Sequence, residues 1–171
     1  MPRIALFVDG ANMFYAQRDQ GWRIEFRSAY EHFTAGKEIA GAYYFTATPP
    51  AGNIQAVQAY RRFRTALIYI GYSVVDKEVH VITDRQTGQT KLKGNLDIEL
   101  TFRMLSTADS WDEAVLLGVD VDYVPIITHL QNLGKTITCV GRRQSTSLEL
   151  INAANRFIDL EDLRRLIEKR K

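Results

Sequence analysis

The chain has 171 residues, of which 46% are hydrophobic and 25% are charged, and its 22 basic and 20 acidic residues leave a formal net charge of +2. This length and composition are typical of one globular domain, residues 1–171, and the absence of any run of roughly 20 apolar residues excludes a membrane span. A single cysteine, Cys139, excludes an internal disulfide, and the three histidines lie far apart in the sequence, which argues against a Cys/His zinc site.

Apolar runs alternate with helix-like segments along the chain. Residues 4–8 form a continuous apolar run that predicts a strand covered on both faces, and because this run is too short for a signal peptide we expect a cytosolic protein. Further strands are predicted at 41–48, 72–76, 114–117, 135–140 and 157–158, with a hairpin at 79–83 and 89–93. Helices are predicted at 12–19, 25–33, from a cap at Asn53 past 67, from Asn95 to about 106, at 121–133, at 147–155 and after Asp159.

The alternation of strands and helices predicts an α/β fold. Strands separated by helices form βαβ units, so we expect a mainly parallel central sheet with helices on both faces. The long helix after Asn53 carries an apolar stripe with a period near 3.6, which predicts that this stripe faces the core. Its members are Ile54, Val57, Tyr60, Phe63 and Leu67.

Four aspartates lie where predicted strands end or where a helix begins. Asp9 ends the first strand, Asp120 and Asp122 follow the strand at 114–117, and Asp97 lies in the first turn after Asn95. Ligands of open parallel sheets bind beyond the carboxyl ends of the strands, where the strand order reverses. Four carboxylates crowded there would repel one another without a cation, and an all-oxygen set suits Mg²⁺ or Mn²⁺. Such a centre can activate water and stabilise charge on a phosphodiester.

Each of these aspartates also has a structural explanation when taken alone. Asp122 could cap a helix, Asp97 could be a favourable first-turn charge, and Asp9 could be a loop residue. Next to Asp9, Gly10 allows close backbone approach, and Asn12 begins a helix whose amide groups favour anions.

Other chemical motifs are incomplete. Gly134-Lys135-Thr136 resembles the end of a phosphate-binding loop, but the first glycine of that motif would fall at His129. The sequence has no Gly-x-Ser-x-Gly elbow, and no Gly-x-Gly-x-x-Gly follows the first strand, which argues against a dinucleotide cofactor. Cys139 lies inside an apolar strand and is predicted to be a core residue without a catalytic role.

Three sequence blocks resemble the signature of the NYN domain, and more closely the bacterial LabA-like branch of the PIN-like nuclease superfamily. They are Val8-Asp9-Gly10-Ala11-Asn12, Lys93-Gly94-Asn95-Leu96-Asp97 and Asp120-Val121-Asp122-Tyr123-Val124-Pro125. Residues 147–160 are similar to the last block of that family, so the resemblance spans nearly the whole chain in the right order.

The resemblance implies a three-layer PIN-like, or Rossmann-like, α/β fold and a metal-dependent ribonuclease site. By this resemblance Asp9, Asp97, Asp120 and Asp122 would coordinate Mg²⁺ or Mn²⁺. Asn12 would help to position the metal, its water or the substrate, and Lys93 could contact a phosphate.

The chain also departs from the family pattern. Gly118-Val119 stands where many relatives have Ser-Gly, Arg103 where some have an acid, and Asn155 where aspartate is common. Glu99 and Arg103 are four residues apart in a predicted helix, so we expect them to form an exposed ion pair.

Two hypotheses for function follow. In the first, the chain is a metal-dependent endoribonuclease acting on single-stranded or structured RNA, and exposed aromatics such as Tyr15 or Tyr123 stack on bases. In the second, the fold is a catalytically weak or inactive RNA-binding or regulatory module. A phosphatase using Asp9 as nucleophile is set aside, because Ala11 stands where that family has a second acid.

RNA is the partner expected in both hypotheses, with no membrane and no nucleotide cofactor. The sequence does not fix the oligomeric state, and a homodimer remains open. Six residues from the basic clusters would hold the RNA backbone: Arg61, Arg62, Lys91, Lys93, Arg142 and Arg143.

Overall fold

The computed structural model describes residues 1–78, 80–93 and 95–171. Six parallel strands form the central sheet in the order β3-β2-β1-β6-β7-β8. Their bounds are β1 Arg3–Asp9, β2 Glu38–Thr48, β3 Ser73–Glu78, β6 Glu113–Leu117, β7 Thr136–Gly141 and β8 Arg156–Asp159.

The side chains of β1 alternate between two hydrophobic cores, one on each face of the sheet. Ile4, Leu6 and Val8 face one core, whereas Ala5 and Phe7 face the other. Both sets are almost fully buried. A strand covered on both faces therefore appears in the sequence as one continuous apolar run.

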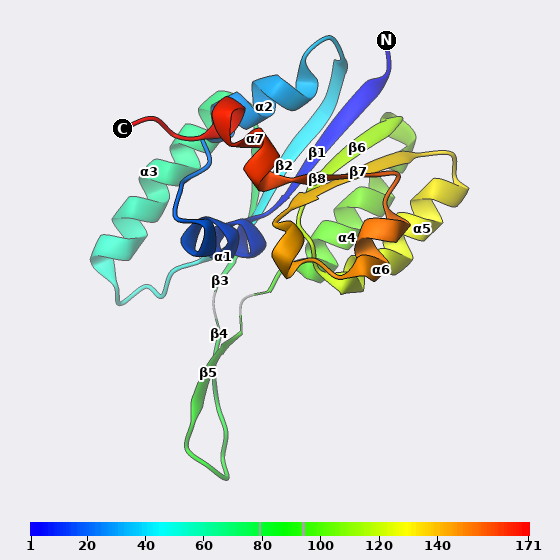
Figure 1. Ribbon diagram of the computed structural model, residues 1–171. Helices are drawn as coiled ribbons and strands as arrows, with labels where there is room; N and C mark the ends of the chain where they lie inside the picture. The colour runs from blue at the N-terminus through cyan, green and yellow to red at the C-terminus, as the bar shows by residue number, and fades with distance from the viewer. Residues whose placement is uncertain (79, 94) are drawn as a thin grey trace.

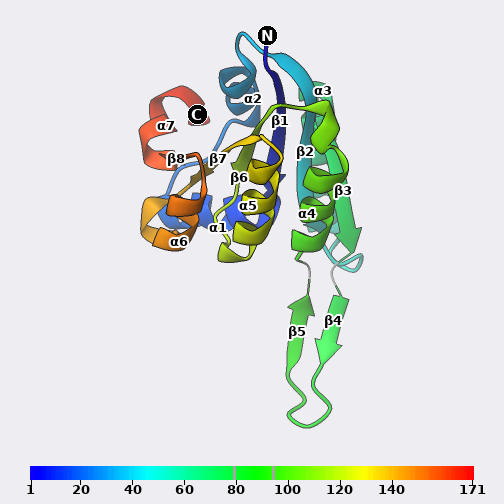
Figure 2. The same cartoon turned by 90° about the vertical axis from the view of Figure 1, so that its right-hand side faces the viewer.

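Helices cover both faces of the sheet and complete three layers (Figures 1 and 2). The core that contains Leu6 receives side chains from α1 Gly10–Gln20, α2 Phe26–Thr34, α3 Ile54–Ile70 and α7 Leu160–Ile167. The core that contains Phe7 receives them from α4 Asp97–Ser106, α5 Val124–Asn132 and α6 Leu148–Ala153. The predicted three-layer α/β fold with a mainly parallel sheet is confirmed, and it is consistent with a PIN-like fold.

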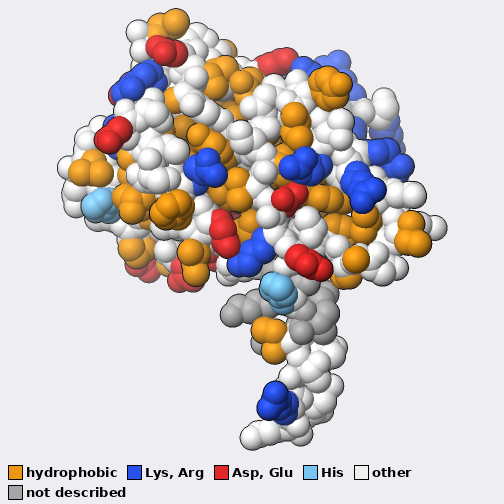
Figure 3. Space-filling model, turned by 180° about the vertical axis from the view of Figure 1, so that it is seen from behind, with side chains coloured by type: hydrophobic (Ala, Val, Ile, Leu, Met, Phe, Trp, Pro, Cys, Tyr) orange, Lys and Arg blue, Asp and Glu red, His pale blue; other side chains and the backbone are white. Residues whose placement is uncertain are grey.

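A hairpin of two antiparallel strands, β4 His80–Thr83 and β5 Thr90–Lys93, projects from the carboxyl side of the sheet (Figures 1 and 2). The prediction of a hairpin is confirmed for these strands, while residue 79 lies outside the described residues. Seen from behind, the hairpin stands clear of a body on which acidic, basic and hydrophobic side chains are interspersed (Figure 3). Within the described ranges, every helix is too short or too polar to cross a membrane.

The helix predicted at 121–133 is wrong in its first turn. Val121–Tyr123 forms a 3₁₀ turn, in which the Tyr123 amide donates to the Asp120 carbonyl, and α5 begins only at Val124. Pro125 lies in the first turn of α5, where its missing N–H and fixed φ are tolerated.

The predicted apolar stripe of α3 faces the core only in part, since the Phe63 ring packs against those of Phe26 and Tyr44, with centroids 6.0 and 5.5 Å apart, while the start of the helix is exposed. Only Leu67 of its five members is buried, and Ile54 is 68% exposed. The reason is that α3 lies at the outer side of the molecule against α2, β2 and β3, so much of its surface meets solvent (Figure 1). Cys139 of β7, by contrast, is fully buried, as predicted, and burial raises the pKa of its thiol to about 12.

Candidate active site

The candidate site lies where the strand order reverses, between β1 and β6. The chain builds β2 and β3 on one side of β1 and β6, β7 and β8 on the other. Val8 of β1 is paired with Leu117 of β6, so Asp9 and the segment that follows Leu117 emerge side by side at the carboxyl edge. This is the place at which open α/β sheets bind ligands.

Gly10 is required by the close approach of α1 to β2. A Cβ atom at this position would lie 2.4 Å from the Phe45 carbonyl oxygen, which no side chain tolerates. Glycine at this position lets α1 begin directly after β1. Asp9 is the N-cap, and its Oδ1 accepts a hydrogen bond of 3.0 Å from the Asn12 amide. The capping interaction orients the Asp9 carboxylate at the strand end.

Tyr123 joins two of the predicted aspartates. Its hydroxyl oxygen lies 2.7 Å from Asp9 Oδ2 and 2.8 Å from Asp97 Oδ1. A phenol has a single hydrogen, so it donates to one carboxylate at a time, and the other contact is favourable only with a proton on a carboxyl group or a cation nearby. The hydroxyl therefore holds two like charges at close range.

Asn95 orients Asp97 from the other side. The Asn95 Oδ1 accepts a hydrogen bond of 3.0 Å from the Asp97 amide, and its Nδ2 donates one of 2.9 Å to Asp97 Oδ2. The N-cap of α4 is Leu96, one residue later than predicted, and Asn95 instead precedes the cap and accepts from the amide of the first helical residue. Both oxygens of the Asp97 carboxylate have partners, which fixes its position at the start of the helix.

Asp120 and Asp122 lie beyond the end of β6. Asp120 is half-buried, and its Oδ1 accepts a hydrogen bond of 2.9 Å from the Asp122 amide. Asp122 itself is exposed. The capping carboxylate of this turn is therefore Asp120, and the alternative in which Asp122 caps a helix is wrong.

The aspartates perturb one another electrostatically. Burial raises the pKa of Asp9, which is only 8% exposed, and the charges of Asp97 and Asp120 raise it further, against the lowering by hydrogen bonds from Asn12 and Tyr123. Burial also raises the pKa of Asp97, and the charges of Asp120 and Asp122 add to that effect. Burial and the neighbouring carboxylates raise the pKa of Tyr123, so its hydroxyl stays protonated. A cation would relieve this repulsion.

The donor chemistry of the cluster fits a hard divalent cation. In the part of the chain that the structure describes, no three acidic, histidine or cysteine side chains are arranged to enclose a metal ion. Mg²⁺ does not need such a cage, because it keeps several waters and is commonly held by one or two carboxylates. The carboxylates around Tyr123 supply only oxygen ligands, which is the chemistry Mg²⁺ and Mn²⁺ prefer.

A cavity of about 250 Å³ adjoins the acidic cluster. Asp120 and Asn12 line it together with Arg142, which follows β7. Its full lining is Asn12, Tyr15, Ala16, Asp19, Val119, Asp120, Arg142 and Ser145.

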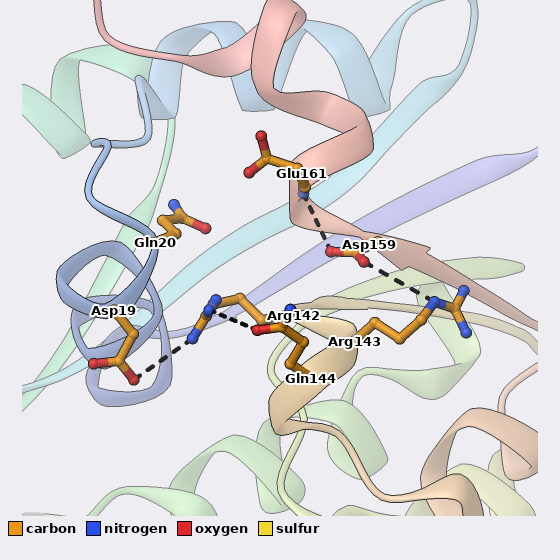
Figure 4. A pocket seen from close by; sticks show the side chains of 7 residues that line it. All are labelled: Asp19, Gln20, Arg142, Arg143, Gln144, Asp159 and Glu161. Carbon is orange, nitrogen blue, oxygen red and sulfur yellow. Dashed lines mark hydrogen bonds and ion pairs between the residues drawn. The ribbon is translucent and has the colours of Figure 1, made fainter.

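A second cavity of about 340 Å³ shares Asp19 and Arg142 with the first (Figure 4). Arg142 lies 3.7 Å from the Asp19 carboxylate, and Arg143 lies 4.0 Å from that of Asp159. The ion pair between Arg142 and Asp19 therefore stands at the junction of the two cavities, beside Asp120.

The sequence profile of the NYN domain matches residues 3–161. The chain belongs to the NYN domain family. It is 37% identical to the low amplitude and bright protein LabA of Synechococcus elongatus over 170 residues, which cover 98% of this chain and 88% of that protein. The family resemblance and its LabA-like branch are thereby confirmed, and the chain is a member of a PIN-like nuclease family.

A solved structure shares the fold of this NYN domain. It is a protein of unknown function from Vibrio parahaemolyticus, with a TM-score of 0.78 and 23% sequence identity, covering 97% of this chain and 96% of that chain. At this identity the likeness shows the fold alone.

Two of the other basic residues predicted to bind substrate, Arg61 and Arg62, do not line the cavity beside Asp120. Arg61 is exposed and lines a separate hollow beside Thr48 and Pro49 at the end of β2, and Arg62 is exposed on α3. The side chains of Lys91 and Lys93 lie outside the described residues. Arg142 is thus the predicted cation that the structure brings beside Asp120.

Two of the departures from the NYN pattern lie at the site itself. A Cβ atom at Gly118 would lie 3.1 Å from the Asp9 Cβ, so a serine there would crowd that carboxylate. Val119 packs against Gly141 of β7, where a Cβ atom would lie 2.0 Å from the Val119 Cγ1. Both departures therefore lie where neighbouring segments are closely packed, Gly118 against Asp9 and Val119 against Gly141.

The other departures lie elsewhere. Asn155 Oδ1 accepts a hydrogen bond of 2.8 Å from the Ile137 amide near the amino end of β7, a structural role away from the acids. The ion pair predicted between Glu99 and Arg103 is wrong, because Glu99 pairs with Lys77 at 2.9 Å. Arg103 instead lies over the Tyr43 ring, 5.0 Å from its centroid.

Sequence reasoning missed the role of Tyr123. Of the two aromatics considered for base stacking, Tyr123 is only 1% exposed and contacts two aspartates, whereas Tyr15 is 53% exposed. The available signal was its place directly after Asp120 and Asp122 in a signature block. Because Tyr123 lies in a 3₁₀ turn, the period of an α-helix does not predict the direction of its side chain.

Proposed function

We propose that this NYN domain is an Mg²⁺- or Mn²⁺-dependent endoribonuclease that hydrolyses RNA phosphodiester bonds at the carboxyl edge between β1 and β6. The observation that carries the proposal is the convergence of Asp9 and Asp97 on one buried hydroxyl, that of Tyr123. Asp120 is close enough that its charge raises the pKa of both. Perturbed carboxylates at a topological switch point are typical of a functional site rather than of a structural one.

Asp9, Asp97 and Asp120 would hold the cation, one or two of them directly and the rest through the waters that Mg²⁺ keeps, and the exposed Asp122 would act as an outer carboxylate. Bound there, a divalent cation activates water and stabilises the negative charge that develops on the phosphodiester. Tyr123 keeps Asp9 and Asp97 together, and Asn95 fixes the direction of Asp97.

Arg142 would contact the RNA backbone next to the acids. It lines the same cavity as Asn12 and Asp120, and its contact with Asp19 holds its guanidinium there. A cation at this place neutralises phosphate charge and positions the substrate for the carboxylate-held ion.

The experiment that tests the proposal is cleavage of mixed-sequence RNA oligonucleotides with Mn²⁺, with Mg²⁺ and with EDTA. Asp97→Asn and Asp120→Asn should lower cleavage by more than the roughly 10- to 100-fold that loss of a supporting group costs. The matched control is Asp112→Asn, since Asp112 precedes β6 at the opposite edge of the sheet and bonds to Arg3. Cleavage that persists in EDTA, or that survives both substitutions, would overturn the proposal.

The alternative is a catalytically weak or inactive RNA-binding or regulatory module. It is favoured by the lack of an enclosed three-ligand site among the described residues. RNA binding of equal strength with Mn²⁺ and with EDTA, and without any product, would select this alternative.

A further inference from the structure

Helix α1 exposes a pair of aromatic rings beside the acidic cluster. Phe14 is 62% exposed, Tyr15 is 53% exposed, and their ring centroids lie 5.5 Å apart in an edge-to-face arrangement. The Arg18 guanidinium lies 4.9 Å from the Tyr15 ring centroid. Tyr15 is therefore held by two neighbours of its own helix while much of its surface remains open to a ligand.

Tyr15 lines the cavity that adjoins Asp120. The lining of this cavity is apolar in part, from Ala16 and Val119 beside the Tyr15 ring, and its uncharged polar groups come from Asn12 and Ser145. Flat ligands with apolar faces and a polar edge match such a lining, and a nucleobase is a ligand of this kind.

The charges of the cavity favour a base over a phosphate on the Tyr15 side. Of the described residues that line this cavity, Asp19 and Asp120 are acidic and Arg142 is basic, and the proposed function already assigns Arg142 to one backbone phosphate. A second phosphate at Tyr15 would meet, among the described residues, only Arg18, which is paired with Asp19 at 3.3 Å. A neutral base needs no such cation.

We propose that Tyr15 is a base-binding residue, on whose ring a nucleobase of the RNA stacks so that the adjoining phosphodiester reaches Asp120. This inference rests on the proposed function for its substrate. Phe14 and Arg18 hold the ring, and Asn12 and Ser145 meet the polar edge of the base. A base in a duplex is stacked between its neighbours, so the nucleotide bound at Tyr15 is unpaired.

Binding measured in EDTA tests this subsite without relying on cleavage. The probe is a short single-stranded RNA that carries the fluorescent base 2-aminopurine at one position in turn, because stacking on an aromatic ring quenches this base. Wild type should quench the probe, and Tyr15→Ala should lose the quenching and weaken RNA binding about 5- to 100-fold. Tyr15→Phe keeps the ring and should restore both properties.

The matched control is Tyr69→Ala. Tyr69 of α3 is 82% exposed, more than Tyr15, but it is not among the residues that line either cavity beside Asp120. Its replacement should leave affinity and quenching unchanged. Annealing the probe to a complementary strand should remove the difference between wild type and Tyr15→Ala.

The outcomes separate this subsite from the nuclease proposal. Loss of quenching in Tyr15→Ala supports the subsite even when no cleavage is found in Mn²⁺, in which case only the nuclease proposal fails. Equal affinity and quenching in wild type and Tyr15→Ala, or no quenching by wild type at any probe position, would overturn the subsite while leaving metal-dependent cleavage intact.

Discussion

Two aspartates at opposite ends of the β1–β6 pair have opposite electrostatic surroundings. Asp112, just before β6, accepts hydrogen bonds from the Arg3 amide at 3.0 Å and from its guanidinium at 2.9 and 3.2 Å. These contacts lower the pKa of Asp112 to about 2. At the other end of β1, burial and like charges raise the pKa of Asp9.

The difference between Asp112 and Asp9 shows that the charge at the amino edge of the sheet stabilises the folded chain, whereas the charge at the carboxyl edge does not. Ionised Asp112 favours the folded chain, because its charge is compensated there by Arg3. Ionised Asp9 disfavours it, because its charge is desolvated among other carboxylates without a compensating ion pair in the described part of the chain. An unfavourable cluster of this kind is typical of a site that binds a ligand.

Among changes that leave the acids in place, the largest effect is expected for Tyr123→Phe at the carboxyl edge. The substitution removes the hydroxyl between Asp9 and Asp97, so Mn²⁺-dependent cleavage should fall about 10- to 100-fold while RNA affinity in EDTA stays the same. The matched change away from the acids is Tyr72→Phe, since the buried Tyr72 hydroxyl donates to the Phe26 carbonyl. Equal cleavage rates in the two variants would show that the Tyr123 hydroxyl has no special role at the carboxyl edge.

A residue between the two edges should affect stability alone. Cys139→Ser places a hydroxyl in the apolar core, which should lower the free energy of unfolding by about 1–3 kcal/mol in urea titrations. Cleavage per folded molecule should not change, because Cys139 contacts neither edge. A folded Cys139→Ser protein without activity would contradict this.

The pH dependence of stability should differ in sign between the edges. Because folding raises the pKa of Asp9, the folded chain loses stability as pH rises from about 4, the pKa of an unfolded aspartate, up to that raised pKa, and Asp9→Asn should therefore raise the melting temperature in EDTA at pH 7. The gain should shrink as pH falls toward about 4, near the pKa of an unfolded aspartate.

Asp112→Asn should have the opposite effect. It should lower the melting temperature at pH 7, and this loss should fade between about pH 4 and pH 2, because the lowered pKa of Asp112 confines its stabilisation to higher pH. Thermal unfolding of both variants from pH 7 to pH 3 checks the two signs. A loss of stability in Asp9→Asn would show that its capping of α1 outweighs the repulsion.

The smallest effect is expected among the cations. The Arg61→Ala/Arg62→Ala double variant should weaken RNA binding and lower the salt slope by at most about one unit per lost contact. Arg142→Ala should weaken binding more, since Arg142 lies beside Asp120. Titrations from low to high salt measure both slopes. An unchanged salt slope in the double variant would show that Arg61 and Arg62 do not contact RNA phosphates, and the predicted backbone contacts would then be Lys91, Lys93 and Arg142.

The positions of the acids could be predicted because buried strands leave a simple signal. The apolar runs of β1 and β6 end at Asp9 and shortly before Asp120, and the rule for parallel sheets places both at one edge. The contact of Asn95 with Asp97 is local in sequence and could be predicted too. The α/β fold class could be predicted because apolar strand-like runs alternate with helix-like segments along the chain.

Contacts set by tertiary packing could not be predicted in this way. Glu99 lies one helical turn from Arg103, yet it pairs with Lys77 from a strand 22 residues earlier. Tyr123 turns inward because a 3₁₀ turn, not a helix, follows β6. In each case the partner comes from a distant part of the chain, about which local periodicity holds no information.

The packing of Val119 on Gly141 couples two positions that are 22 residues apart. A side chain at 141 and a branched side chain at 119 cannot coexist, because the added Cβ would overlap the Val119 methyl group. Relatives with glycine at the position of Val119 are therefore free to carry a larger residue at the position of Gly141, and the two sites should co-vary across the family. Gly141→Ala alone should be harmful here, and a second change, Val119→Gly, should rescue it.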